Sequence, residues 1–597
     1  MGCNISATRR QLFRFSVLSG LLAPVMGLFF SCDKDKIDFH VDNSPPAYGL
    51  SEVRVVNLAD YSRVVANGDT LTAGTAGVQT TYFQEDGLLG TVWRIQQPLF
   101  DDRGKLDLKL SDLYSPAAYI VPPSDPVAFT ANTADGQMDY YTVWPGGDGQ
   151  PWAVPVPRDE TPPKIADRFK IRIVNLCKHL PGLHPDLPSP NGPMEDLAGS
   201  VTLTYADGTP VSPKTTDVSI SQRVSEYVDV PYGTYQFRVL TSDGRQFSAA
   251  VHGVNERLIR SNVFDPTTSR MTEPKTTNVT GITYAPVMTF KAGGVYTIAV
   301  APFPFAYPIA PGSNVYAYQN QFKIIEDREN PPQSLGRVQA VNAFPGADVS
   351  FRLAAGSVGK VFSGLAFGQA SDYVAIEEGG YTIEALNNRG AVIATVQQEM
   401  LTSQNHSVWL YPDEGGQPQL KVVFNDLSGD FYFNRFTDDG AFNRYENTTV
   451  FATRFLNFCP DMPFVSVSID NGQDMRNYMQ LYANNSYEMH ADNAMYNLGF
   501  AEPVTELPYV RWRLDYRVLF DLQAFRSKPG IKPGIWADDI PSLSSFNFIA
   551  NPQLYLKVGR GLPTGEPGVY SVALVGRTGN DVPAEQRARM VIIKHTK

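Results

Sequence analysis

One short pattern recurs four times along this 597-residue chain and constrains its fold more than any other feature. Each copy alternates apolar and polar residues and ends in asparagine. The alternation is typical of a β-strand with one buried face, and asparagine favours a chain reversal directly after the strand. The asparagines lie about 115 to 170 residues apart, which is a domain-sized spacing and too long for a solenoid repeat. The four copies are Val53-Arg54-Val55-Val56-Asn57, Ile171-Arg172-Ile173-Val174-Asn175, Val338-Gln339-Ala340-Val341-Asn342 and Thr453-Arg454-Phe455-Leu456-Asn457.

The residues that follow the second and third copies also match. In the second copy an apolar segment at 201–205 leads to an Asp-Gly pair and then to a longer segment at 227–239. The third copy has the same order, with segments at 349–353 and 373–385. Asp-Gly and Asn-Gly pairs between apolar runs indicate β-hairpins, and many short strands with regular turns indicate a sandwich or a barrel. A closing apolar segment follows at 294–300, 406–410 and 568–575.

These units resemble an uncharacterised family of bacterial extracellular domains found in envelope lipoproteins and adhesin-like proteins. The resemblance covers the second and third copies well, the fourth at its two ends, and the first in its opening strand. It implies an all-β chain of tandem immunoglobulin-like β-sandwich domains. The resemblance assigns no catalytic residue.

The repeats and the segments between them predict the domain boundaries. Proline- and glycine-rich or polar stretches at 145–163, 326–332 and 425–447 separate the units. The fourth unit has a predicted insertion near 501–545, and a long insertion in a compact domain often carries function. The predicted organisation is a signal peptide at 1–31, a lipidated N-terminus and tether at 32–47, and β-sandwich domains at 48–160, 164–327, 334–428 and 447–597.

The N-terminus predicts export and a lipid anchor. Three arginines between residues 9 and 14 precede an apolar stretch at 15–30, as in a signal peptide. Ser31-Cys32 and the charged residues after it resemble a lipobox, which implies that Cys32 is acylated. The charged residues are similar to the surface-export tags of Bacteroidota-type lipoproteins, which implies the outer face of the outer membrane. An uncleaved membrane anchor is the alternative, and the paired arginines leave the twin-arginine export route open.

Charge and cysteine content exclude several classes of protein. With 50 Lys and Arg against 61 Asp and Glu, the net charge of −11 argues against binding to nucleic acid or to anionic membrane surfaces in general. Cys3 lies in the predicted signal peptide and Cys32 is the predicted lipid anchor, so only Cys177 and Cys459 are left in the rest of the predicted mature chain. A disulfide framework is therefore not expected. We do not expect a disulfide between these two cysteines, because they occupy matched places in separate units.

Candidate metal and nucleophile motifs fit ordinary loops better than catalytic sites. Zinc uses the ligand types that occur at Cys177, His179, His184 and Asp186, but their spacing matches no closed four-ligand pattern, so neither a metal nor a cofactor is expected. Ser357 lies in a shortened form of the Gly-x-Ser-x-Gly motif at a predicted hairpin tip, whereas a nucleophile elbow needs a strand that leads into a helix.

Paired acids are the remaining candidates for catalysis. Glycoside hydrolysis needs two carboxyl groups that face each other across about 5 Å or about 6.5 to 9.5 Å. Adjacent acids point to opposite sides of a strand, so solvated turns are the expected location of these pairs. The pairs are Asp101-Asp102, Asp438-Asp439 and Asp538-Asp539.

Two aromatic segments are candidate binding sites. Trp144 and Trp152 flank a glycine-rich loop, where their rings could stack on sugars or anchor a partner, or could instead be buried at a domain junction. Arg511, Trp512 and Arg513 lie on a predicted strand that faces a partner or forms an edge protected by charge.

The expected function is that of a non-enzymatic outer-envelope lipoprotein that acts as a binding or structural module. Its expected partners are the membrane, through the lipid anchor, and a glycan or an envelope or host protein. Two alternatives stay open. They are a polysaccharide-processing enzyme with accessory β domains and a fimbria-like assembly subunit that exchanges strands at an exposed edge.

Overall fold

The computed structural model describes most of the chain after residue 48. All described residues lie in one compact unit, Tyr48–Lys597. Cys32 and the predicted signal peptide lie outside the described residues. The described ranges are 49–59, 61–74, 78–83, 87–111, 126–144, 152–180, 197–250, 263–265, 270–272, 284–285, 287–310, 313–328, 334–346, 348–356, 358–427, 450–473, 476–482, 485–490, 492–513, 519–556, 562–563 and 565–597.

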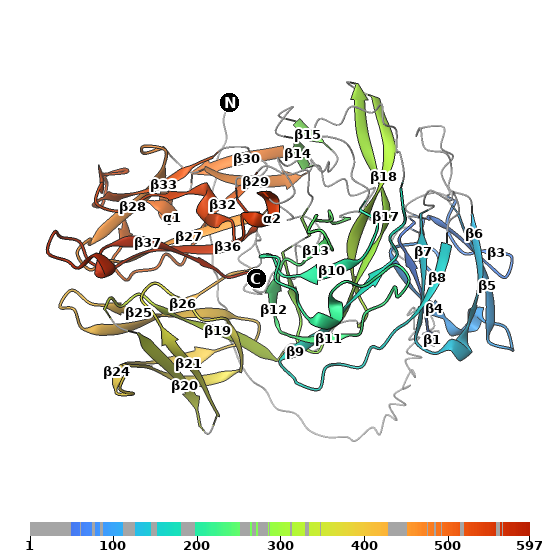
Figure 1. The fold of residues 1–597 in the computed structure, drawn as a ribbon, viewed down its shortest axis with the longest axis horizontal. Helices are drawn as coiled ribbons and strands as arrows, with labels where there is room; N and C mark the ends of the chain where they lie inside the picture. Colours follow the sequence, from blue (N-terminus) through green and yellow to red (C-terminus); the bar gives the residue numbers. More distant parts are fainter. Residues whose placement is uncertain are drawn as a thin grey trace, which may run out of the picture. The chain divides into compact units, whose positions relative to one another are not determined.

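The described chain is almost entirely β-structure and forms four successive β-sandwiches (Figure 1). The predicted all-β fold of tandem β-sandwiches is therefore confirmed. In the first sandwich two four-stranded sheets, in the orders β4-β1-β7-β8 and β3-β2-β5-β6, enclose one core. Its strands are β1 (Leu50–Asn57), β2 (Arg63–Ala66), β3 (Asp69–Thr70), β4 (Val92–Gln96), β5 (Lys105–Ser111), β6 (Val127–Asn132), β7 (Met138–Val143) and β8 (Trp152–Pro157).

The third sandwich has the same topology as the first. Its sheets have the orders β22-β19-β25-β26 and β21-β20-β23-β24, so each strand has a counterpart in the first sandwich at the same place. The strands are β19 (Leu335–Asn342), β20 (Val349–Ala355), β21 (Val358–Leu365), β22 (Val374–Glu377), β23 (Gly379–Leu386), β24 (Val392–Met400), β25 (Asn405–Pro412) and β26 (Pro418–Phe424).

The second sandwich keeps the first of these sheets, in the order β11-β9-β17-β18. The opposite layer is divided into the pairs β10-β13 and β12-β16, and β14-β15 forms a separate hairpin. The strands are β9 (Arg168–Asn175), β10 (Val201–Thr204), β11 (Val228–Pro231), β12 (Gly233–Tyr235), β13 (Arg238–Thr241), β14 (Val263–Asp265), β15 (Arg270–Thr272), β16 (Met288–Phe290), β17 (Val295–Ala310) and β18 (Ser313–Glu326).

The fourth sandwich has sheets in the orders β32-β27-β36-β37 and β31-β28-β33-β34, with β35 also paired to β33. The segment expected to be an insertion, 501–545, contains β32 to β35 and so supplies strands to both sheets. Relative to the first and third sandwiches, the fourth also has the hairpin β29-β30, the strand β35 and two short α-helices. The elements are β27 (Val450–Phe458), β28 (Phe464–Ile469), β29 (Arg476–Tyr482), β30 (Asn485–His490), α1 (Asp492–Met495), β31 (Leu498–Gly499), β32 (Tyr509–Arg513), β33 (Asp521–Arg526), β34 (Ile535–Trp536), β35 (Leu543–Ser544), α2 (Gln553–Leu556), β36 (Gly568–Val575) and β37 (Arg589–Lys594).

The four sequence motifs occupy the same strand in every sandwich, which we call the motif strand: β1, β9, β19 and β27. Each motif strand pairs antiparallel with one neighbour and parallel with the other. The parallel neighbours are β7, β17, β25 and β36, and the last three contain the closing apolar segments of the sequence pattern. The repeat in the sequence is therefore a repeat of sheet topology.

The asparagine that ends each motif strand forms the turn after it. Its side-chain oxygen accepts a hydrogen bond from a backbone N–H just downstream, at Tyr61, Cys177, Phe344 and Cys459. Its amide group donates to backbone carbonyls, such as that of Met462 for Asn457 at 2.7 Å. A buried backbone group needs such a partner, which explains why all four copies end in the same residue.

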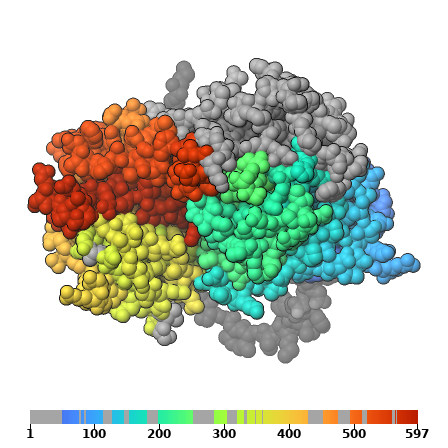
Figure 2. Space-filling view, in the orientation of Figure 1, coloured from blue at the N-terminus to red at the C-terminus, as the bar shows by residue number. Residues whose placement is uncertain are grey.

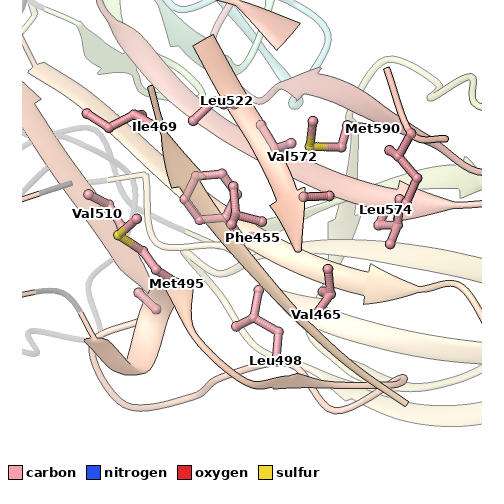
Figure 3. Close-up of a cluster of buried hydrophobic side chains, with 14 of the residues drawn as sticks. Phe455, Val465, Ile469, Met495, Leu498, Val510, Leu522, Val572, Leu574 and Met590 are labelled. Atoms are coloured by element: carbon pink, nitrogen blue, oxygen red, sulfur yellow. The ribbon is translucent and has the colours of Figure 1, made fainter. Parts of the chain in front are cut away.

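The cores lie between the two sheets of each sandwich. Figure 3 shows part of the fourth core, where Phe455 of the motif strand lies among Val465, Leu522 and Val572 from three other strands. Full burial of one such side chain contributes about 1.5 to 3 kcal/mol. No helix among the described residues is long and apolar enough to span a membrane.

Candidate functional site

The motif strands are buried on both faces, which corrects the expectation of one buried face. In β1, Val53 and Val55 point into the core of the first sandwich. Arg54 and Val56 point to the other side and are also buried, with 2% and 0% of their surface exposed. The second face is covered because each motif-strand sheet packs against that of a neighbouring sandwich.

The first and second sandwiches share an apolar cluster between their motif-strand sheets. Val56 of the first motif strand and Val174 of the second occupy the same motif position, and both belong to this cluster. The remaining buried members come from both sandwiches and are Leu58, Tyr141, Val143, Val154, Val156, Leu176, Ala299, Ala301, Phe303 and Ile325.

A buried ionic cluster lies beside this apolar cluster. The Arg54 guanidinium donates to both carboxylate oxygens of Asp139 at 2.8 Å and to the Asp327 carboxylate, also at 2.8 Å. Arg158 is also paired with Asp139, and the Tyr227 hydroxyl donates to Asp327 at 2.8 Å. Burial alone would lower the pKa of Arg54, but the hydrogen bond and charge of Asp139 and the charge of Asp327 raise it. Arg54 therefore stays charged inside the protein.

The third and fourth sandwiches pair in the same way. Val341 and Leu456, at the motif position of Val56 and Val174, lie in one cluster with Trp409 and Phe458, whose rings stack at 5.0 Å. In Figure 2 the third sandwich, in yellow, meets the fourth, in red. Burial, together with the charges of Arg454 and Arg337, lowers the pKa of the buried His595 to about 3, so its imidazole is neutral at pH 7.

The second residue of the motif makes an equivalent contact in all four sandwiches. The residue at this position is Arg54, Arg172, Gln339 or Arg454, and its side chain reaches the end of the last strand of the paired sandwich. The contacts are Arg54 Nη1 to Glu326 O at 3.2 Å, Arg172 Nη1 to Pro157 O at 2.6 Å, Arg454 Nη1 to Phe424 O at 2.5 Å, and Gln339 Oε1 with His595 Nδ1 at 2.7 Å. Three of the four residues are arginines, and this recurrence in the sequence could have indicated that the position makes a common contact.

Two further buried arginines connect the second sandwich to the other pair. Arg238 donates to the Glu566 carboxylate at 2.8 Å. Burial would raise the pKa of Glu566, but the charges of Arg238 and Lys594 hold it below its usual value. The Arg337 side chain donates to the Thr234 hydroxyl at 2.8 Å and lies over the Tyr232 ring.

Most of the described polar groups at these junctions are paired with one another, and none is arranged for catalysis. Each of these arginines has an acid or a carbonyl within hydrogen-bond distance, although Arg172 Nη2, Arg238 Nε and Arg454 Nε have no hydrogen-bond partner. Buried ion pairs add little net stability because desolvation offsets their attraction, but removing one partner leaves a costly unpaired charge. A shifted pairing of the sheets would leave such a charge unpaired, so the junction groups favour the observed pairing.

The residues predicted to bind a partner lie on two sandwiches, Trp144 and Trp152 on the first and Arg511, Trp512 and Arg513 on the fourth. Trp144 is 4% exposed and belongs to the core of the first sandwich, so its ring cannot stack on a ligand in this arrangement. Trp152 begins β8, and its side chain and the loop before it lie outside the described residues. Arg511, Trp512 and Arg513 lie on β32, an edge strand paired with β27, which confirms the predicted strand. Their side chains also lie outside the described part.

Cys177 lies in the core of the second sandwich and Cys459 in the core of the fourth. Burial raises the pKa of Cys459 to about 12, so its thiol stays protonated at pH 7. Within the described ranges no group of His, Cys, Asp and Glu has the arrangement of a metal site. His184 and Asp186 lie outside those ranges.

The remaining motifs have structural roles. Gly356 is part of the tip that joins β20 to β21, with Ala355 opposite Val358, which confirms the predicted hairpin. The Asp101 carboxylate accepts hydrogen bonds from two backbone N–H groups of its own turn. The Asp539 carboxylate accepts two from Arg526, at 2.7 and 2.6 Å. The pair Asp438-Asp439 lies outside the described residues.

Comparison with known proteins gives little guidance. No protein-family model matches the chain. No curated protein matches it either. A solved structure titled "The Bacillus anthracis TIE protein" is similar at 8% sequence identity, with a TM-score of 0.12, over 66% of this chain and 51% of that one. The chain thus spans about half the length of that protein, and a likeness of this size indicates no shared function.

Proposed function

We propose that the chain is a non-enzymatic lipoprotein of the outer envelope that acts as a binding or structural component. The observation that supports this most is the fixed pairing of sandwiches through their motif strands. The cluster around Arg54 and Asp327 and its counterpart around Arg454 and His595 favour the observed pairing of the sheets. A chain with this pairing would hold the surface loops of different sandwiches at constant positions relative to one another.

The proposed anchor is Cys32. Ser31-Cys32 follows an apolar stretch and precedes charged residues, which is the order of a lipobox. Two or more acyl chains on one cysteine would hold the protein on a membrane, because each buried CH₂ contributes about 0.8 kcal/mol. Mass spectrometry of the native N-terminus tests this directly. An acylated Cys32 is expected, and a mature chain that still begins at Met1 would contradict it.

The proposed partners are a glycan or an envelope or host protein. Residues 33–597, purified without the signal peptide, would be screened against glycan and protein panels, and we expect selective binding to one ligand class. The rival function is a polysaccharide-processing enzyme. Turnover of a polymer that is lost when one acid pair is replaced, together with the absence of binding, would establish that rival instead.

A further inference from the structure

The edge of the fourth sandwich carries an exposed apolar segment that no function above uses. The segment Lys528–Trp536, which we call the wedge, follows β33 and ends with the two-residue edge strand β34. Ile531, Ile535 and Trp536 expose 43%, 76% and 53% of their surface. Ile535 is the most exposed of the large apolar side chains in the described part of the chain.

Backbone hydrogen bonds hold the wedge in place at both ends. Before it, the Ser527 N–H donates to the Phe464 carbonyl at 3.2 Å, and within it the Ile531 N–H donates to the Lys528 carbonyl at 3.0 Å. After it, the Ala537 N–H donates to the Ala524 carbonyl at 3.0 Å. The apolar side chains are therefore presented by ordered backbone.

The two most exposed side chains lie on opposite sides of the sheet. Ile535 is opposite Arg526 on β33, and Trp536 is opposite Phe525. Successive residues of a strand point to opposite faces, so a flat protein partner could cover Ile535 or Trp536 but not both. A fluid apolar medium can cover both at once.

The charges beside the wedge favour an anionic surface. Lys528 and Lys532 are exposed, and the Lys532 ammonium lies 5.3 Å from the centre of the Tyr496 ring. Of the acids that follow, Asp539 is neutralised by Arg526, and Asp538 is exposed. The segment from Arg526 to Asp539 has three basic residues and two acidic ones, a net charge of +1, whereas the whole chain carries −11. This face is therefore suited to approach lipid phosphates, which attract a lysine with about 1 kcal/mol.

We propose that the wedge inserts into the headgroup boundary of an anionic lipid bilayer. Ile531, Ile535 and Trp536 enter the acyl boundary, and the two lysines stay at the phosphates. Tryptophan is favoured at this depth because its ring is apolar and its N–H is polar. The open edge of β34 keeps the insertion shallow, because unpaired backbone groups cannot enter the hydrocarbon core. The contact is separate from Cys32 and from any glycan or protein partner.

Vesicle flotation tests the wedge with a chain that cannot be acylated. Residues 33–597 are mixed with vesicles of phosphatidylethanolamine and phosphatidylglycerol in equal parts. We expect the wild-type chain to float and the double variant Ile535→Ser, Trp536→Ser to partition at least about tenfold more weakly. The matched control is Val361→Ser, Val392→Ser, because these valines are 62% and 46% exposed on the third sandwich. This control should float like the wild type.

A second variant separates loss of binding from loss of folding. Lys528→Glu leaves the apolar side chains in place and should weaken partitioning about fivefold or more at low salt, with a smaller difference at high salt. The proposal is overturned if the wild type stays in the soluble fraction or if neither wedge variant weakens flotation. It is also overturned if the valine control loses as much of its vesicle binding as the double wedge variant does. Self-association that the double variant abolishes, seen by sedimentation without vesicles, would assign the wedge to a second copy of the chain instead.

Discussion

Arg54 of the first sandwich and Asp327 at the end of the second form an ion pair of 2.8 Å with side-chain exposures of 3% and 0%. The two residues are 273 positions apart in the sequence. Their contact joins two sandwiches that the sequence pattern presents as separate modules. The first prediction concerns this pair.

Replacing Arg54 with alanine should strongly destabilise the chain. Asp139 and Asp327 would then lose a buried counter-charge, and breaking a buried pair in this way costs about 3 to 5 kcal/mol. The control is Arg352→Ala, which breaks an exposed pair with Glu384 and should cost less than about 1 kcal/mol. Urea denaturation followed by fluorescence measures both. Equal midpoints for the two variants would contradict the buried role of Arg54.

The motif asparagines should contribute more to the free energy of unfolding than asparagines in surface turns. Asn457→Ala removes two donated bonds and the bond from the Cys459 N–H, and leaves buried backbone groups unpaired. At about 1 kcal/mol for each bond, the expected loss of unfolding free energy is about 3 kcal/mol. Asn387→Ala, in an exposed turn, removes two accepted bonds that water can replace, so it should lose only about 1 kcal/mol. Thermal denaturation of the two variants would show a similar drop if the motif residue had no special role.

Stability should fall on acidification partly because of His595. Burial depresses its pKa to about 3 in the folded chain, whereas the unfolded chain binds the proton near pH 6.5. The contribution of His595 is therefore complete above pH 6.5 and is lost as the pH falls toward 3, at roughly 1 kcal/mol for each pH unit. His595→Gln should flatten the dependence of the urea midpoint on pH between 6.5 and 4. An unchanged slope in this variant would mean that other groups set the dependence, such as carboxylates and His406, whose pKa burial lowers to about 4.

Cys459 should resist alkylation in the folded protein. Burial raises the pKa of its thiol to about 12, and the thiolate is the reactive form. Iodoacetamide at pH 8 should modify Cys459 slowly without denaturant and fully in urea, as measured by peptide mass spectrometry. Rapid modification of the native chain would show that the core of the fourth sandwich opens easily.

The repeated strand, the hairpin turns and the all-β fold could be predicted because each depends on residues that are close together in the sequence. The closing segments at 406–410 and 568–575 could also be predicted, since each contains an apolar run, Val408-Trp409-Leu410 and Val572-Ala573-Leu574-Val575. The fourth sandwich was harder to interpret. Its strands β33 to β35 are not flanked by the turn residues that recur in the other units, so the sequence predicted an insertion at 501–545. The segment instead supplies strands to both sheets.

The second buried face of the motif strands could not be predicted from local pattern. The alternating pattern predicts that Arg54 faces solvent, because arginine is seldom buried without a partner. Its partners Asp139 and Asp327 are far away in the sequence, and alternation carries no information about them. Trp144 shows the opposite case: a large ring beside a glycine-rich loop suggested a ligand site, but the ring completes the core of its own sandwich.

Because the sandwiches pair through their motif strands, the pairing limits how the number of sandwiches in such a chain can change. A sandwich deleted alone would leave the arginine of its former neighbour facing water where an acid or a carbonyl had been. Recombination that removes or duplicates sandwiches should therefore be tolerated in steps of two, and related chains are expected to carry even numbers of them.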